Sequence, residues 1–461
     1  MNLTIWGAAK QVTGSMHLLE VGDYSILVDC GLDYERDTFQ EENQYFPFNP
    51  ASIDVVILTH AHIDHSGNLP TLLRMGFNGQ ILCTPPTADL TELLLMDSVN
   101  IFLSKQQKRS RGKRSGSGPK PLYLHKHVMD TVERFITIGF HKIFQIRQGI
   151  SLQFIPVGHL LGAAAVVLEI EEQGVTKKIA FTGDVGRRNY PVLVDPQPLP
   201  AVDYLVTEST YGGRIHSKDT TITAKLKDII EETCIKFPGR LIIPAFSIGR
   251  TQALVFTLNK LFSSGELPPV KIFVDSPLAE FATDVYRKHH QLLNDEAQDF
   301  YHRSGDEFEF DSLSYVQDKR ESISISNYHE PCIIISSAGM LEGGRIQDHL
   351  YHNIQNYYCT ILFIGYCAKG TLGHRLLRGD SIVRLRHRDL SVYATIKKTD
   401  LLSGHGDHDD LMSNIVGQDP NQLKKVFLVH GEDSSLSSLA SAIEAAGYTA
   451  VIAEKGESYI L

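Results

Sequence analysis

Cysteine is scarce in this sequence, and its few copies form no recognisable site. The six cysteines among 461 residues include no C-x-x-C pair and no spacing typical of a secreted disulfide framework. Such isolated cysteines indicate small buried side chains in a reducing compartment. The chain also lacks a basic start followed by an apolar run, and no apolar stretch reaches the length of a membrane span. We therefore expect a soluble, cytoplasmic protein with no membrane partner.

An excess of positive charge is missing as well. The formal net charge is −10, which argues against a protein that coats nucleic acid through overall positive charge. A local basic track, or an acidic site whose charge is offset by bound cations, is compatible with this value. The length, with 42% hydrophobic residues, indicates a globular chain of two domains.

Two patterns of secondary structure divide the chain. Short strand-like runs come in clusters over residues 1–209 and return in 392–461, which favours layered sheets over a doubly wound parallel sheet. Helix and strand alternate over residues 210–391, as in an α/β unit with parallel strands. We therefore predict one domain formed by 1–209 and 392–461, with residues 210–391 inserted into it as a second domain.

The stretch HAHIDH at residues 60–65 concentrates metal-ligand side chains directly after the apolar run DVVILT. His60 and His62 can point the same way where a strand continues into a turn. Asp64 and His65 lie near an expected helix start and point elsewhere. One tetrahedral ion would not gather all four side chains, whereas two neighbouring ions could share them. A lone histidine would indicate a hydrogen-bonded loop residue, but four such groups in six positions predict a metal site.

Further apolar runs end in ligand-type residues. They are FIPV before Gly158 and His159, IAFT before Gly183 and Asp184, YLVT before Glu208, and VFLV before His430. Each residue by itself could simply mark the exit of a strand. Side chains at strand ends are held rigidly, as a metal site requires, so together these residues predict a dinuclear site.

These motifs resemble a known family. HAHIDH, with Asp29 before it and His159 and Asp184 after it, is similar to the metallo-β-lactamase superfamily. The inserted domain, with Glu208, GHGD at 404–407 and VHGE at 429–432, resembles the β-CASP branch of nucleic-acid nucleases, which contains ribonuclease J and the endonuclease subunit of the cleavage and polyadenylation specificity factor. The resemblance covers nearly the whole chain. It implies an α/β fold, a metallo-β-lactamase αββα sandwich with an inserted α/β β-CASP domain.

The resemblance also implies roles for the motif residues. Two Zn²⁺ ions would be bound, with manganese or iron as alternatives. The implied roles are His60, His62 and His159 on one ion, Asp64, His65 and His430 on the other, Asp184 between the two, Asp29 orienting ligands, and His405 paired with Glu208 as the general acid. A histidine at position 430 is typical of RNA-directed members, so single-stranded RNA is the expected substrate, with 5′-phosphate and 3′-hydroxyl products.

Contacts to RNA are predicted in the inserted domain. SSAGMLEGGR at 336–345 follows the buried-strand pattern CIIIS and could present backbone N–H groups to a phosphate, although glycines mark ordinary turns far more often. A basic cluster follows it and could bind a nucleic-acid backbone. The predicted substrate-binding residues are Ser336, Ser337, Gly339, Gly343, Gly344, Arg345, Lys369 and Arg375. The basic segment 104–120 is either an RNA-binding rim or a plain surface loop, and His17 has no motif around it.

Several alternatives stay open at this point. A hydrolase of small esters or thioesters would share the dinuclear site, but it has no need of the long insertion or of the Glu208 and His405 pair. A DNA-directed nuclease of the same branch is a second alternative. A non-catalytic RNA-binding scaffold is a third, although every ligand position is filled. Internal cutting and cutting from the 5′ end would use the same residues, and a homodimer is one mode of assembly known among such proteins.

Overall fold

The computed structural model of the chain describes residues 1–34, 43–110, 121–217 and 221–461, with only the backbone of 105–110. These residues form two compact units. Unit 1 consists of Met1–Arg188, Val194–Ile215 and His405–Leu461, and unit 2 of Asn189–Leu193 and His216–Gly404. Of the basic segment 104–120, residues 111–120 lie outside the described residues, so its predicted role is not addressed by the structure.

The insertion differs in extent from the one predicted from the sequence. We predicted residues 210–391, whereas unit 2 continues to Gly404. The reason is strand β19 (Thr395–Lys398), which pairs in parallel with β16 (Cys359–Phe363) of unit 2. A short strand pattern does not reveal which sheet the strand will join, because pairing is a long-range contact.

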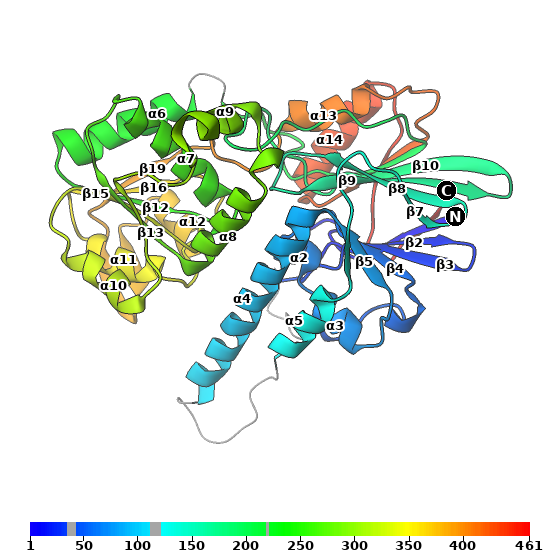
Figure 1. Cartoon of the computed structure of the whole chain (residues 1–461), viewed down its shortest axis with the longest axis horizontal. Helices are drawn as coiled ribbons and strands as arrows, with labels where there is room; N and C mark the ends of the chain where they lie inside the picture. Colours follow the sequence, from blue (N-terminus) through cyan, green and yellow to red (C-terminus); the bar gives the residue numbers. More distant parts are fainter. Residues whose placement is uncertain (35–42, 111–120, 218–220) are drawn as a thin grey trace. The chain divides into compact units, whose positions relative to one another are not determined.

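Unit 1 contains two seven-stranded sheets (Figure 1). The first sheet has, in spatial order, β22 (Ser458–Ile460), β1 (Asn2–Ile5), β2 (His17–Val21), β3 (Tyr24–Val28), β4 (Val55–Ile57), β5 (Gln80–Cys83) and β6 (Phe135–Thr137). The second sheet has β21 (Ala450–Ile452), β20 (Lys425–Val429), β11 (Tyr204–Glu208), β10 (Val175–Phe181), β9 (Ala164–Glu172), β8 (Ile150–Pro156) and β7 (Phe144–Arg147). The two termini lie side by side, because β1 pairs with β22 (Figure 1).

Side chains on each strand of the first sheet alternate between two hydrophobic cores. Ile26 and Val28 belong to the core that both sheets share, whereas Leu27 points to the opposite face. That opposite face packs against Leu69 and Leu72 of helix α3. The helices of unit 1 are η1 (Pro50–Ser52), α2 (Ile63–Ser66), α3 (Leu69–Arg74), α4 (Pro85–Ser110), α5 (His125–Val132), α13 (His408–Val416) and α14 (Asp433–Ala445). Since α14 packs against β20 and β21 of the second sheet, the predicted αββα sandwich is confirmed.

Unit 2 is built on a six-stranded parallel sheet. Its strands, in spatial order, are β14 (Leu313–Tyr315), β13 (Lys271–Asp275), β15 (Cys332–Ser336), β12 (Arg240–Pro244), β16 and β19, beside a separate hairpin of β17 (Ile382–Leu385) and β18 (Arg388–Ser391). All five residues of β15 and of β16 are buried, as expected for parallel strands covered on both faces. The predicted parallel α/β unit is therefore confirmed.

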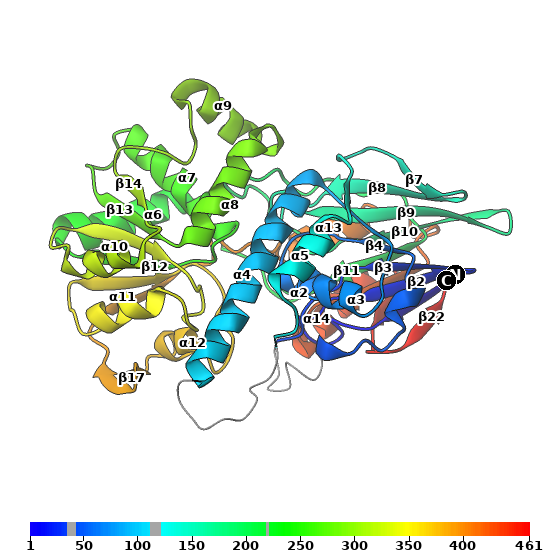
Figure 2. The same ribbon diagram turned by 60° about the horizontal axis from the view of Figure 1, so that its bottom comes forward.

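Helices cover both faces of the parallel sheet. Ile346 and Leu350 of α11 and Leu372 and Leu376 of α12 share a core with alternate residues of the central strands. Figure 2 shows α10, α11 and α12 on one side of these strands and α6, α7 and α8 on the other. The helices of unit 2 are α6 (Ile222–Ile230), η2 (Glu231–Lys236), α7 (Arg250–Ser263), α8 (Pro277–Lys288), η3 (His290–Leu292), α9 (Asp295–Ser304), α10 (Lys319–Ser324), η4 (Ile325–Asn327), α11 (Ile346–Asn353) and α12 (Leu372–Leu377).

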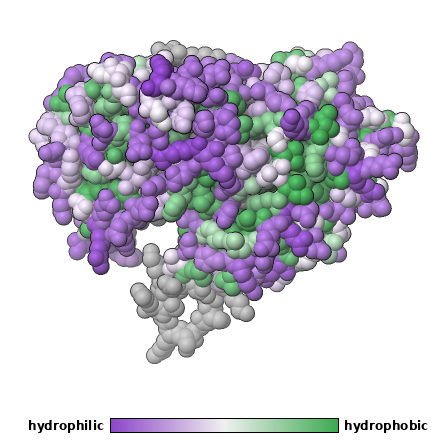
Figure 3. All heavy atoms as spheres, viewed as in Figure 1, coloured by the Kyte–Doolittle hydropathy of each residue, from purple (hydrophilic) through white to green (hydrophobic). Residues whose placement is uncertain are grey.

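The surface is mixed in polarity. Hydrophilic residues cover most of the face in Figure 3, with hydrophobic residues scattered between them. Among the described residues, no helix combines the length and the apolar character that a bilayer crossing demands.

The carboxylate of Asp275, at the end of β13, connects three other segments of unit 2 through hydrogen bonds. It is fully buried and accepts hydrogen bonds from Ser322 Oγ, Arg345 Nη1 and His349 Nε2, each 2.6 Å long. Asp275→Ala would leave a guanidinium and an imidazole without their anion. We expect the free energy of unfolding of unit 2 to fall by about 3–5 kcal/mol.

Asp284→Ala is the matched control, because Asp284 is exposed and pairs with Arg287 on its own helix. That variant should lose no more than about 1 kcal/mol. Urea unfolding followed by circular dichroism compares the two variants. Equal losses would show that the buried network around Asp275 contributes no more than a surface ion pair.

Candidate metal centre

The ligand-type residues predicted from the sequence lie together in unit 1. Strands β8, β10, β11 and β20 run in one direction, so their carboxyl ends share one edge of the second sheet. The first sheet brings the end of β4 and the short helix α2 to the same place. These ends supply His60 and His62 after β4, Asp64 and His65 in α2, His159 after β8, Asp184 after β10, Glu208 at the end of β11, and His430 after β20.

Three histidines and one aspartate form the first cluster. His62 Nδ1 lies 3.1 Å from His60 Nε2 and 3.2 Å from His159 Nε2. Asp184 Oδ2 lies 3.6 Å from the Nε2 atoms of both His60 and His159. Three ring nitrogens that converge beside one carboxylate oxygen form a set that could hold a metal ion.

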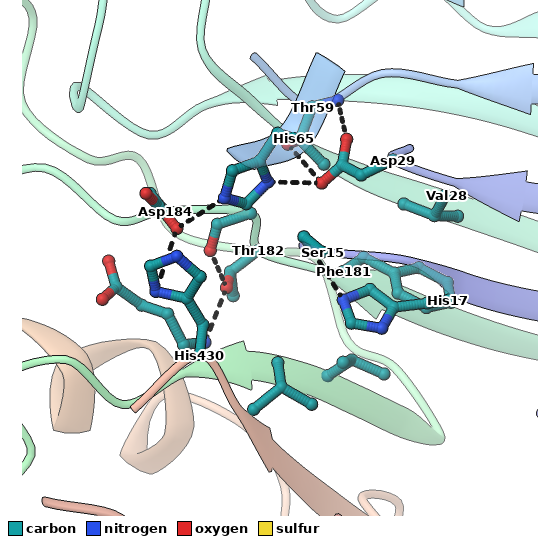
Figure 4. Close-up of a pocket in the computed structure, with 14 residues that line it drawn as sticks. Ser15, His17, Val28, Asp29, Thr59, His65, Phe181, Thr182, Asp184 and His430 are labelled. Atoms are coloured by element: carbon teal, nitrogen blue, oxygen red, sulfur yellow. Dashed lines mark hydrogen bonds and ion pairs between the residues drawn. The ribbon is translucent and has the colours of Figure 1, made fainter. Parts of the chain in front are cut away.

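The second cluster consists of Asp64, His65 and His430. His430 Nε2 lies 3.6 Å from Asp64 Oδ2. The other oxygen of Asp184, Oδ1, lies 3.4 Å from His65 Nε2 and 3.6 Å from His430 Nδ1. Figure 4 shows Asp184 between His65 and His430. Each cluster therefore uses a different oxygen of Asp184, which places this carboxylate between two sites for cations.

Hydrogen bonds behind the clusters fix the protonated nitrogen of two ligands. Asp29 Oδ2 accepts a hydrogen bond of 2.7 Å from His65 Nδ1 and one of 2.8 Å from Thr59 Oγ1 (Figure 4). Since the single Thr59 hydroxyl proton is used there, Thr59 Oγ1 accepts from His60 Nδ1 at 3.1 Å. Both rings therefore turn the Nε2 atom toward Asp184.

Buried polar atoms without partners mark the centre. His65 Nε2, Asp184 Oδ1 and His430 Nε2 are buried and make no hydrogen bond within the described part of the chain. Thr210 Oγ1 donates to the His430 carbonyl oxygen, so it accepts from His430 Nδ1 at 3.1 Å and leaves Nε2 bare. Buried polar atoms of this kind are costly unless a ligand satisfies them, and a cation suits nitrogen and carboxylate donors. The residues present thus fit metal ions.

The backbone at the centre adopts conformations that few side chains tolerate. Asp29 has φ of 62° and His430 has φ of 51°, although neither is a glycine. Gly183, which precedes Asp184, has φ of 56°, and a Cβ atom there would lie 2.7 Å from Thr59 Cβ. Such residues persist only where the surrounding structure holds them, as the two sheets do here.

The histidines of the two clusters differ in pKa because burial and neighbouring charge act on them to different extents. Burial lowers the pKa of His60 well below its usual value and that of His62 to about 4. Burial also opposes the charging of His65 and His430, but neighbouring carboxylates, Asp184 foremost, outweigh it. The pKa of His65 is therefore raised and that of His430 is about 9. His60 and His62 are therefore neutral at pH 7, whereas His65 and His430 hold protons that a metal ion must displace.

A histidine and glutamate pair borders the first cluster. His405 Nδ1 donates to both oxygens of Glu208, 3.1 Å away in each case, and His405 Nε2 lies 3.9 Å from Asp184 Oδ2. Glu208 is 1% exposed and also accepts from the Val185 backbone N–H at 2.6 Å. Burial lowers the pKa of His405, but Glu208 and Asp184 outweigh it and raise the pKa above its usual value. His405 can thus keep a proton on Nε2 beside the two clusters of ligand-type side chains.

The predicted substrate-binding residues all belong to unit 2, and the structure gives several of them internal partners. Ser336 Oγ donates to the Asp275 carbonyl oxygen, and Arg345 pairs with the Asp275 carboxylate. Arg375 pairs with Asp380 at 3.0 Å. Of the remaining residues, Lys369 is exposed, Ser337 donates to Ser276 Oγ, Gly339 packs against Phe246, and Gly343 and Gly344 have positive φ. Their part in binding stays a prediction.

Three residues at the centre were not singled out by their sequence pattern. Thr59 holds Asp29 and His60, and its position directly before the first histidine was the available signal. The Tyr211 ring lies edge-on to His405, with centroids 6.1 Å apart. His17 is buried behind the centre, beside Ser15 and Phe181 (Figure 4), and burial lowers its pKa to about 3. No sequence motif around His17 predicts this position.

Lowering the pH should release metal from the second cluster before the first. Below pH 9 a metal ion must displace a proton from His430, and His65 must lose one as well, so the apparent affinity should fall at least about tenfold per pH unit. His62, whose pKa is about 4, imposes no such cost above pH 5. Metal content per chain, measured after dialysis between pH 8 and 5, should fall in two steps. His430→Ala should remove the step at higher pH, and simultaneous release from both clusters would contradict the assignment.

Three protein-family models match successive parts of the chain. The family model of the metallo-beta-lactamase superfamily matches residues 10–222, and that of the Beta-Casp domain matches 251–376. A third model, the Zn-dependent metallo-hydrolase RNA specificity domain, matches 389–453. A crystal structure of a protein of unknown function from Enterococcus faecalis V583 has a TM-score of 0.54 at 13% identity, over 100% of this chain and 99% of that chain, and shares the fold.

Relatives resemble the chain along most of its length. Ribonuclease TTHA0252 of Thermus thermophilus is 29% identical over 99% of both chains. Transcription termination factor FttA of Pyrococcus horikoshii is 30% identical over 96% of this chain and 68% of its own. The fold, the clusters around Asp184 and these similarities agree with the resemblance seen in the motifs. The chain therefore belongs to the β-CASP family of metallo-β-lactamase-fold nucleases, which are metal-dependent enzymes.

Proposed function

We propose that the chain is a zinc-dependent ribonuclease that hydrolyses phosphodiester bonds of single-stranded RNA and leaves 5′-phosphate and 3′-hydroxyl ends. The observation that carries this proposal is the Glu208 and His405 pair beside Asp184. The RNA specificity domain model, which spans His405 and His430, and the name of the Thermus relative support RNA as the substrate.

Two Zn²⁺ ions suit the donor set. Zinc binds imidazole nitrogen and carboxylate oxygen at about 2.0–2.2 Å, so two ligands of one tetrahedral ion stand about 3.3–3.6 Å apart. In the first cluster His62 Nδ1 lies 3.1 and 3.2 Å from the Nε2 atoms of His60 and His159, and Asp184 Oδ2 lies 3.6 Å from each of those two atoms, close to that separation. Asp64, His65 and His430 would hold the second ion. When bound, the pair would activate the attacking water and stabilise charge on the phosphate.

His405 would protonate the departing sugar oxygen. Hydrolysis that leaves a 3′-hydroxyl breaks the bond between phosphorus and the 3′ oxygen, and an alkoxide is a poor leaving group without a proton. The Nε2–H of His405 faces the metal clusters, and Glu208 on the opposite nitrogen keeps the ring oriented and protonated. The departing oxygen thus receives its proton from a side chain already fixed in place.

The same pair favours a phosphodiester over a thioester. A thiol has a pKa near 8.5, so a thiolate leaves without help from an acid. An enzyme for small thioesters would therefore gain little from a buried glutamate that raises the pKa of a histidine. The Glu208 and His405 pair consequently supports the nuclease over the thioester alternative.

Cleavage of one single-stranded RNA, labelled in turn at either end, tests the proposal. Purified protein should cut it in zinc or manganese, and a chelator should stop the reaction. Mononucleotides released at once from the 5′ label would indicate an exonuclease, and intermediate fragments would indicate internal cutting. DNA of the same sequence and a thioester substrate are the controls. Products with a 2′,3′-cyclic phosphate, or faster turnover of either control, would contradict the proposal.

Glu208→Gln should impair general-acid catalysis by His405 without changing metal binding. The amide removes the charge that raises the pKa of His405, so kcat should fall about 100-fold. Because a general acid is active while protonated, the loss of rate on the alkaline side should move to lower pH. The pH dependence of kcat measures this, with metal content as a check on the clusters.

Glu444→Gln is the control for this variant, because Glu444 is exposed on α14. It should keep the rate and the pH profile of the original chain. A Glu208→Gln enzyme with an unshifted alkaline limb would remove His405 from its role as proton donor.

A further inference from the structure

The carboxyl edge of the parallel sheet in unit 2 is where a ligand would bind in a fold of this kind. Strands β12 and β15 are parallel neighbours. The chain leaves β12 through α7 toward β13 on one side, and leaves β15 through α11 toward β16 on the other. Open α/β sheets bind ligands outside the carboxyl ends of two such strands. The loops at this edge are 245–249 after β12, 337–345 after β15 and 364–371 after β16.

Side chains from these loops form an ordered stack at the edge. The guanidinium carbon of Arg250 lies 4.7 Å from the centroid of the Phe246 ring. A Cβ atom at Gly339 would lie 3.3 Å from that ring, and one at Gly365 would lie 2.3 Å from Arg250 Nη1. The two glycines therefore leave the space in which the ring and the guanidinium lie. Three separate strand ends contribute to the position of one cation.

The charge of Arg250 is unpaired among the residues that the structure describes. Within the described residues, its guanidinium makes neither an ion pair nor a hydrogen bond, although the side chain is half-buried. Arg250 is also the first residue of the long helix α7, where the helix dipole disfavours a positive charge. By contrast, the predicted ligands Arg345 and Arg375 have carboxylate partners in Asp275 and Asp380. A rigidly held guanidinium without an anion is suited to bind a phosphate.

We propose that Arg250, stacked on Phe246, binds a backbone phosphate of the single-stranded substrate. That the substrate is RNA rests on the proposed function. Phe246 is 37% exposed, so the stack is accessible from solvent. An aromatic ring beside a cation is the combination that proteins use to hold single strands without reading their sequence. In unit 2, Arg250 rather than Arg345 is thus the phosphate ligand.

Binding of a fluorescent twelve-nucleotide RNA, measured by anisotropy at several salt concentrations, tests this subsite. The metal-loaded full chain carrying His405→Asn is used as the parent, so that turnover does not consume the probe. Adding Arg250→Gln should weaken binding about tenfold and reduce the salt slope by about 0.7, the value for one phosphate contact on a single strand. Adding Gly365→Ala should weaken binding to a similar extent, because its Cβ displaces the guanidinium while the charge is kept.

Arg303→Gln is the matched control, since Arg303 is an exposed arginine on α9 that donates to a carbonyl of its own helix. It should bind within twofold of the parent, and thermal unfolding of all variants checks that they are folded. If Arg250→Gln binds RNA with the parent's affinity and salt slope, the inference is wrong. If binding depends on Arg250 but the unaltered chain does not cut RNA, the inference holds and the ribonuclease proposal fails.

Discussion

The Asp184 carboxylate, buried among imidazole rings, is the group on which the structure of unit 1 depends. Its two oxygens face nitrogens of His60 and His159 on one side and of His65 and His430 on the other, at 3.4 to 3.6 Å. Titratable groups packed so closely are stable only when positive charge lies among them, as ring protons or as metal ions. The second cluster holds protons because Asp29 beside His65 and Asp64 beside His430 add their charge to that of Asp184.

The parts around Asp184 serve to hold these groups in one geometry. Asp29 and Thr59 determine which nitrogen of His60 and His65 carries the proton. The left-handed backbone of Asp29 and of His430 would be unstable alone, so the two sheets must supply the difference through their shared core. A metal site of this kind therefore needs a large rigid scaffold, which a seven-stranded sheet on each side provides.

In unit 2 two arginines at the same edge of the sheet differ in their ion pairs. Arg345 meets Asp275 and contributes to the fold, whereas Arg250 meets an aromatic ring and no carboxylate among the described residues. Both lie beside the carboxyl edge of the same parallel sheet, and both follow a strand with a glycine close by. Only the pairing of each side chain separates a structural arginine from one available to a substrate.

The sequence by itself determined the ligand types and their places at strand ends. HAHIDH, Asp184 and His430 follow apolar runs, and a strand followed by a turn is a local pattern that neighbouring residues dictate. The layered first domain and the parallel second one were predictable for the same reason. Tertiary structure alone decided that β19 joins unit 2 and that His17 is buried behind the metal centre. It also decided that Asp275 pairs with Arg345, while Arg250 has no ion pair in the described part of the chain. These outcomes depend on contacts between residues far apart in the chain, which no local pattern encodes.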